Sequence, residues 1–155
     1  MPAEGNRSKK PSGVGSRSLP EAEEFFVERS LGGKVILEVL REAGYIVHTH
    51  ADHFAPDCPD PEWLHAVGQR GWIVLTKDAR IRYRPRERAT LLDARVKAFI
   101  LTGKGGTGAD MARTFLKAIP AIRRIASETP PPFIAHVWKS GEVKVMEPKP
   151  DSAPR

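Results

Sequence analysis

Carboxylates stand beside apolar stretches in three well-separated parts of the chain. They are Glu28, the pair Asp60 and Glu62, and Asp78. Like charges that crowd together repel, so such a cluster requires a cation or protons. Carboxylate oxygens are hard ligands that suit Mg²⁺ or Mn²⁺, and a divalent ion beside a phosphate activates water and stabilises charge on a phosphodiester. These acids therefore predict a metal site. The alternative is purely structural, with Asp60 as a helix N-cap and Asp78 as the cap of a turn.

Positive charge gathers immediately after Asp78. Between residues 70 and 97, nine basic side chains stand against three acidic ones, an excess equal to the +6 of the whole chain. The basic side chains are Arg70, Lys77, Arg80, Arg82, Arg84, Arg86, Arg88, Arg95 and Lys97. Arginine makes bidentate contacts with phosphate, and Tyr83 within this run offers a ring on which a base can stack. The pattern indicates phosphate binding beside the acids, and the alternative is a solvated basic loop.

Two further motifs point elsewhere. His48, His50 and His53 invite a zinc site, although histidines at a strand end are more often hydrogen-bonded or partly buried. Residues 103–108 match G-x-G-x-x-G, but the following helix leads to three prolines instead of a strand that ends in an acid. Thr107 and Asp110 in this loop fit a helix capping box. We expect no nucleotide cofactor, and we keep zinc as a minor alternative.

The elements that must position these residues alternate between strand and helix. Strands are predicted at Glu24–Glu28, Tyr45–Thr49, Trp72–Thr76 and Val96–Thr102, with a hairpin at Phe133–Lys139 and Glu142–Met146. Helices are predicted at Leu31–Ala43, Asp60–Arg70, Pro85–Ala94 and Thr107–Ser127. This order predicts an α/β fold, a three-layer α/β/α sandwich with a mainly parallel sheet and the hairpin at its edge. In such sheets ligands bind at the carboxyl ends of the strands, where the acids fall.

Composition limits the class of protein. The 155 residues suit one domain, predicted at residues 21–146, and the polar, basic segment 1–20 and the segment 147–155 read as disordered tails. Neither an apolar run long enough to span a bilayer nor a secretory signal is recognisable. The single cysteine, Cys58, offers no internal disulfide. We expect a cytoplasmic protein that does not contact membranes.

Two stretches carry a family resemblance. FFVERSLGGKVILEVLREAGYIVHTHADHF followed by PDPEWLHAVGQRGWIVLTKDARIRYRP resembles the PIN-like nuclease domains, within the bacterial group allied to VapC-type toxins and the Mut7-C domain. The resemblance runs from about Phe25 to about Val145. Its most specific part is Val74–Asp78 together with Asp60–Leu64 upstream. The resemblance implies a metal-dependent ribonuclease whose acidic cluster binds Mg²⁺ or Mn²⁺ at the carboxyl edge of a parallel sheet.

Carried onto this chain, the resemblance assigns metal binding and catalysis to Glu28, Asp60 and Asp78, with Glu62 the less favoured helix acid. Glu28 departs from the pattern, because the family usually has Asp there, and the extra methylene moves the ligand oxygens by about 1.5 Å. A second departure is that Thr102 and Gly103 stand where many members have another acid.

The resemblance also supplies the expected partners. We expect RNA as the substrate, positioned by Lys77, Arg80, Arg82 and Arg84, with the chain as the toxin of a toxin–antitoxin pair that binds an antitoxin protein and forms a homodimer. The alternatives are an RNA- or protein-binding module in which Glu28 has weakened metal binding, and a nuclease that acts on DNA.

Overall fold

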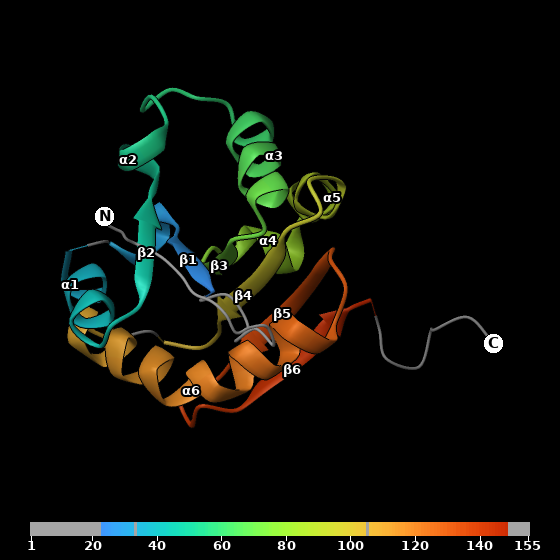
Figure 1. Cartoon of the computed structure of the whole chain (residues 1–155). Helices are drawn as coiled ribbons and strands as arrows, with labels where there is room; N and C mark the ends of the chain where they lie inside the picture. The colour runs from blue at the N-terminus through green and yellow to red at the C-terminus, as the bar shows by residue number, and fades with distance from the viewer. Residues whose placement is uncertain (1–22, 33, 105, 149–155) are drawn as a thin grey trace, which may run out of the picture.

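The computed structural model describes residues 23–32, 34–104 and 106–148, so the two predicted tails lie largely outside the described residues. A six-stranded sheet has the order β2-β1-β3-β4-β5-β6 (Figure 1). The strands are β1 (Glu24–Val27), β2 (Ile46–Thr49), β3 (Ile73–Thr76), β4 (Lys97–Leu101), β5 (Phe133–Val137) and β6 (Val143–Glu147). The helices are η1 (Arg29–Leu31), α1 (Lys34–Glu42), α2 (His50–His53), α3 (Asp60–Arg70), α4 (Arg80–Tyr83), α5 (Pro85–Asp93) and α6 (Gly108–Glu128).

The sheet is parallel except at one edge. Strands β2, β1, β3, β4 and β5 run in the same direction, and β6 pairs with β5 in the antiparallel sense. This arrangement confirms the predicted α/β sandwich and the hairpin at its edge. Strand β6 reaches Glu147, one residue into the segment predicted as a C-terminal tail. No described helix is long and apolar enough to cross a membrane.

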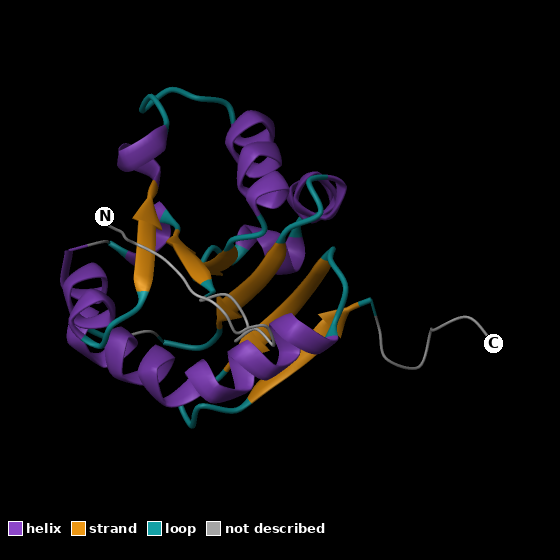
Figure 2. Ribbon diagram, viewed as in Figure 1, coloured by secondary structure: helices purple, strands orange, loops and turns teal. Residues whose placement is uncertain are grey.

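Helices cover both faces of the sheet (Figure 2). Helices α1 and α6 bury Ile36 and Phe115 against one face, which includes Phe25 and Phe99. Helices α3 and α5 cover the other face, where Trp63, Leu64 and Leu91 pack with Phe26. Every residue of β3 is buried, as a central strand covered on both sides requires.

One glycine permits the close packing of α3 on this second face. A Cβ at Gly68 would lie 1.9 Å from the carbonyl oxygen of Ala94 and 3.3 Å from Val96 Cγ1. Backbone atoms of α3 therefore approach the segment between α5 and β4 too closely for any side chain. This approach fixes α3, and with it the N-terminal acid Asp60, against the sheet.

The structure differs from the sequence prediction in the short elements. The predicted helix at Leu31–Ala43 is wrong at its start, because η1 ends at Leu31, Gly32 takes a left-handed φ of 80°, and α1 begins only at Lys34. Helices α2 and α4 were not predicted. Helix α2 begins with a capping box in which Thr49 and Asp52 exchange hydrogen bonds. The predicted capping box of Thr107 and Asp110 is confirmed at α6.

Candidate functional site

A pocket of about 270 Å³ opens at the carboxyl ends of β1 and β3, bounded by α3, α4 and α5. We call it the acidic pocket, because Glu28, Asp60 and Asp78 all line it. The parallel pairing of Val27 with Leu75 sets the ends of β1 and β3 side by side, and this places Glu28 near Asp78. The structure thus brings the three predicted acids to one pocket.

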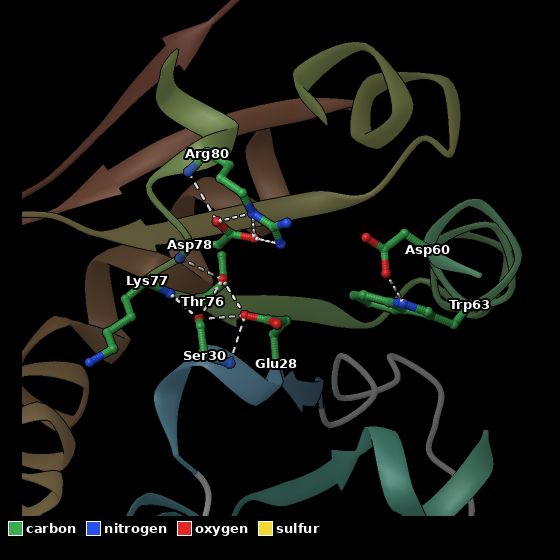
Figure 3. Close-up of polar contacts among 8 residues, drawn as sticks. All are labelled: Glu28, Ser30, Asp60, Trp63, Thr76, Lys77, Asp78 and Arg80. Atoms are coloured by element: carbon green, nitrogen blue, oxygen red, sulfur yellow. Dashed lines mark hydrogen bonds and ion pairs between the residues drawn. The ribbon is translucent and has the colours of Figure 1, made fainter. Parts of the chain in front are cut away.

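Glu28 is fixed by a network that joins the two strand ends. Its Oε1 accepts hydrogen bonds from the backbone N–H of Ser30 at 3.0 Å, from the Ser30 hydroxyl, and from the Thr76 hydroxyl at 2.7 Å (Figure 3). Thr76 is fully buried and accepts from the backbone N–H of Asp78 at 3.0 Å. Ser30 accepts from the backbone N–H of Lys77, also at 3.0 Å. Ser30 and Thr76 therefore orient Glu28, and Thr76 also positions Asp78, so that the network fixes two of the acids that line the pocket.

Asp78 carries its own counter-charge. The Arg80 Nε lies 3.0 Å from Asp78 Oδ1 and the Arg80 Nη2 lies 2.7 Å from Oδ2, a bidentate ion pair. The hydrogen bonds from Arg80 hold the pKa of the Asp78 carboxyl below its usual range, and the carboxylates of Asp78 and then Asp60 raise the pKa of the Arg80 guanidinium. Arg80 thus supplies part of the positive charge that an acidic cluster requires.

Asp60 faces the pocket from the first turn of α3. The N-cap of α3 is Pro59, without a side-chain cap, so the interpretation of Asp60 as an ordinary N-cap is wrong. Asp60 Oδ1 accepts from the indole N–H of Trp63 at 2.9 Å, and the carboxylate stands across from Glu28 and Asp78 in Figure 3. Glu62 does not line the acidic pocket.

The structural interpretation of Asp78 is partly confirmed. Its Oδ1 accepts from the backbone N–H of Arg80 at 3.0 Å, so Asp78 does cap the turn that leads into α4. This cap does not conflict with a role in the pocket, because Asp78 lines that pocket as well.

The donor set fits a hard divalent cation. Four carboxylates, those of Glu28, Asp60, Asp78 and Glu87, line the pocket together with the hydroxyls of Thr76 and Thr90, and oxygen ligands of this kind are the ones that Mg²⁺ and Mn²⁺ prefer. Within the described ranges, no three His, Cys, Asp or Glu side chains lie close enough together to form a complete metal site. The arrangement is thus an acidic pocket of suitable chemistry whose Asp78 is paired with Arg80.

The predicted basic residues spread over two pockets. Arg80 lines the acidic pocket, while Lys77 lines a neighbouring pocket of about 290 Å³ with Lys34 and Ser30. Arg84 lies near enough to Asp78 to lower the pKa of that carboxyl. The side chain of Arg82 is outside the described part of the structure, and Tyr83 on α4 is 69% exposed.

Two more arginines line the acidic pocket, Arg29 and Arg86. From the sequence, Arg86 was counted in the basic run but not named among the residues that position RNA, and Arg29 was given no role. The signal for Arg29 was its position immediately after Glu28, and the signal for Arg86 was its place in the arginine run.

The three histidines do not gather as a zinc site. His48 lies 2.7 Å from Glu24 and 2.8 Å from His53 through its two ring nitrogens, and its ring stacks on Trp72 at 3.8 Å. His50 begins α2 and packs instead against Phe54 and Trp63. No group of three His, Cys, Asp or Glu side chains in the described part of the chain could hold a metal ion, so the zinc alternative gains no support.

Comparison with known proteins agrees with the geometry. The family described as "PIN like domain" matches residues 24–103. The chain is also 33% identical over 132 residues to the protein named "Putative ribonuclease VapC45" from Mycobacterium tuberculosis (strain ATCC 25618 / H37Rv), and the match covers 83% of this chain and 95% of that relative. No solved structure matches significantly.

Proposed function

The chain belongs to the PIN-like domain family, and on that premise we propose that it is a Mg²⁺- or Mn²⁺-dependent endoribonuclease that hydrolyses RNA phosphodiesters. The observation that carries this proposal is the acidic pocket, in which Glu28, Asp60 and Asp78 come together from three separate segments. The name of the relative, a ribonuclease of the VapC group, supports RNA as the substrate.

In this proposal the three carboxylates hold the metal. The bound ion supplies activation of water and neutralisation of the charge that develops on the phosphate. Thr76 and Ser30 orient Glu28 through their hydrogen bonds, so that its carboxylate faces the pocket without searching other conformations. The chain then requires no side-chain nucleophile.

The arginines of the pocket have a second task. Arg29, Arg80 and Arg86 line the same space as the acids, and a guanidinium makes bidentate contacts with phosphate. We propose that they hold the RNA backbone together with Lys77, Arg82 and Arg84. Binding should therefore weaken steeply as the salt concentration rises.

The cellular role follows the relative. We propose that the chain is the toxin of a toxin–antitoxin pair in the cytoplasm, and that an antitoxin protein inhibits it by covering the acidic pocket. We further propose a homodimer, which light scattering of the purified chain would test.

A second candidate function is an RNA- or protein-binding module without catalysis. It is favoured by the ion pair between Arg80 and Asp78, which neutralises one of the three acids. Metal-dependent protection from unfolding separates the two candidates, because only an intact metal site couples ion binding to stability.

The decisive test is cleavage of a mixed-sequence fluorogenic RNA in Mn²⁺, in Mg²⁺ and in EDTA. Wild type should cleave only with metal, and Asp78→Asn should abolish cleavage. Asp93→Asn, which alters an exposed acid near the end of α5, is the matched control and should retain activity. Equal activity of Asp78→Asn and wild type would contradict the proposal. Competition with single-stranded DNA tests the choice of nucleic acid.

A further inference from the structure

A second cavity adjoins the acidic pocket on the side of α2. It has a volume of about 290 Å³ and is bounded by the end of β1, η1 and α2. Glu28 and Arg29 line both cavities. We propose that this second cavity, the Phe54 pocket, binds the base of an RNA nucleotide next to the phosphodiester that is cleaved. The inference rests on the proposed function and names the part of the RNA that confers sequence preference.

The size and walls of the Phe54 pocket suit a planar base. A cavity of about 150 Å³ is enough for benzene, so the Phe54 pocket has room for a larger heteroaromatic ring. Phe54 is half-buried there and offers an aromatic surface, and Pro56 adds an apolar wall. Stacking of bases on aromatic side chains is a general way in which proteins hold single-stranded nucleic acid.

His50 supplies an unused polar group in this wall. It is only 3% exposed, and its Nε2 is buried without a hydrogen-bond partner among the described residues. Burial, and then the nearby Arg29, lower the pKa of His50, so its ring is neutral near pH 7 and carries one donor and one acceptor nitrogen. The edge of a base carries complementary donors and acceptors. A base bound in the cavity would bring such groups to the wall that His50 lines.

Arg29 connects the Phe54 pocket to the acidic pocket. Its Nη1 donates to the carbonyl oxygen of Pro56 at 3.2 Å, which holds the guanidinium beside the loop after α2. The remaining donors of Arg29 are available to a phosphate at the boundary of the two cavities. A nucleotide with its base against Phe54 would thus have its phosphate within reach of Arg29, which lines both cavities.

The test measures binding separately from catalysis. The probes are the four ribonucleoside monophosphates, added in EDTA to the full chain, with the ring signals of His50 followed by NMR and assigned from His50→Gln. Ribose 5-phosphate, which has the phosphate but no base, is the control probe. We expect at least one nucleotide to shift the His50 signals, and ribose 5-phosphate to leave them unchanged.

The variants remove the aromatic surface. Phe54→Ala should weaken nucleotide binding by roughly 5- to 150-fold, the loss that corresponds to removal of one base–aromatic stack. Because Phe54 also contacts Phe26, Phe54→Leu serves as a second variant that keeps the apolar packing without the ring. Ile46→Ala, at an exposed position of β2, is the matched control and should bind like wild type.

The outcomes are distinct. Binding lost in both Phe54 variants supports the inference, and in a cleaving enzyme the same variants should flatten the base preference at one position beside the cut. Equal shifts with ribose 5-phosphate, unchanged binding in Phe54→Leu, or no shift with any nucleotide would overturn it. Nucleotide binding without RNA cleavage would contradict the proposed nuclease and leave the base site standing. If a protein partner shields Phe54 from solvent and no nucleotide does, the cavity is the binding site of that partner and the inference is overturned.

Discussion

Shortening Glu28 by one methylene tests how the strand ends are joined. Glu28 Oε1 reaches Thr76 on the neighbouring strand at 2.7 Å, as well as the backbone N–H of Ser30. Aspartate would withdraw the oxygens by about 1.5 Å, which is enough to move them out of hydrogen-bond range of Thr76. Asp at this position still caps the Ser30 N–H, because a short acid is a good N-cap. Glu28→Asp should therefore lose the inter-strand bond and keep the local one.

The expected cost follows from these contacts. A hydrogen bond to a charged group contributes about 1.5–3 kcal/mol, and part of that is recovered because the buried Thr76 hydroxyl also lies 3.2 Å from Ser30 Oγ. We expect Glu28→Asp to lower the free energy of unfolding by about 1–2 kcal/mol. At about 4 °C per kcal/mol, the Tm should fall by about 4–8 °C.

Urea and thermal unfolding in EDTA measure this change without any contribution from metal. Glu62→Asp is the matched control, since it shortens another glutamate, one outside the acidic pocket, and should change stability by less than about 0.5 kcal/mol. A Glu28→Asp chain as stable as wild type would refute the reasoning. The glutamate would then be a simple replacement for the aspartate usual in the family, with no structural use of its extra length.

Three further predictions address packing, metal affinity and pH. Gly68→Ala should destabilise the fold by about 3 kcal/mol or more in urea unfolding, because its Cβ would overlap the carbonyl of Ala94; a loss below 1 kcal/mol would contradict the close packing of α3. Arg80→Gln should tighten Mn²⁺ binding roughly 3- to 10-fold by calorimetry without RNA, because it frees Asp78; unchanged or weaker binding would show that the ion pair does not compete. The lowered pKa of His50 means that the unfolded chain takes up a proton below pH 6.5 before the folded chain does, so stability should fall as the pH drops below 6.5, and less so in His50→Gln. Identical urea midpoints against pH for the two chains would contradict the burial of a neutral His50.

The long elements of the fold were predictable because their patterns are strong. Helix α3 has the predicted bounds, since a first-turn proline and a terminal Gly71 mark both ends. Strand β3 was predicted from its apolar run, although it begins one residue later, at Ile73. The short helices α2 and α4 were missed because one turn carries too little periodicity to be recognised.

The site was predictable where it depends on topology. Parallel strands place their carboxyl ends at one edge of a sheet, so Glu28 and Asp78 could be expected at the same edge, whereas the pairing of β1 with β3 that makes them neighbours is known only from the structure. The bidentate contact of Arg80 with Asp78 could not be predicted. The alternating arginines give no indication of the turn that leads from Asp78 into α4 and brings the two side chains together. The buried, unpartnered nitrogen of His50 could not be predicted either, because it depends on packing between α2 and α3.

The central claim is that carboxylates from three distant segments form one metal site. Titration with Mn²⁺, followed by the EPR signal of the free ion, tests it most directly on the full chain without RNA. We predict that wild type binds Mn²⁺, and that Glu28→Gln, Asp60→Asn and Asp78→Asn each weaken binding by at least about tenfold, the effect of about 1.4 kcal/mol. Binding that all three variants leave unchanged, or no binding by wild type, would contradict it.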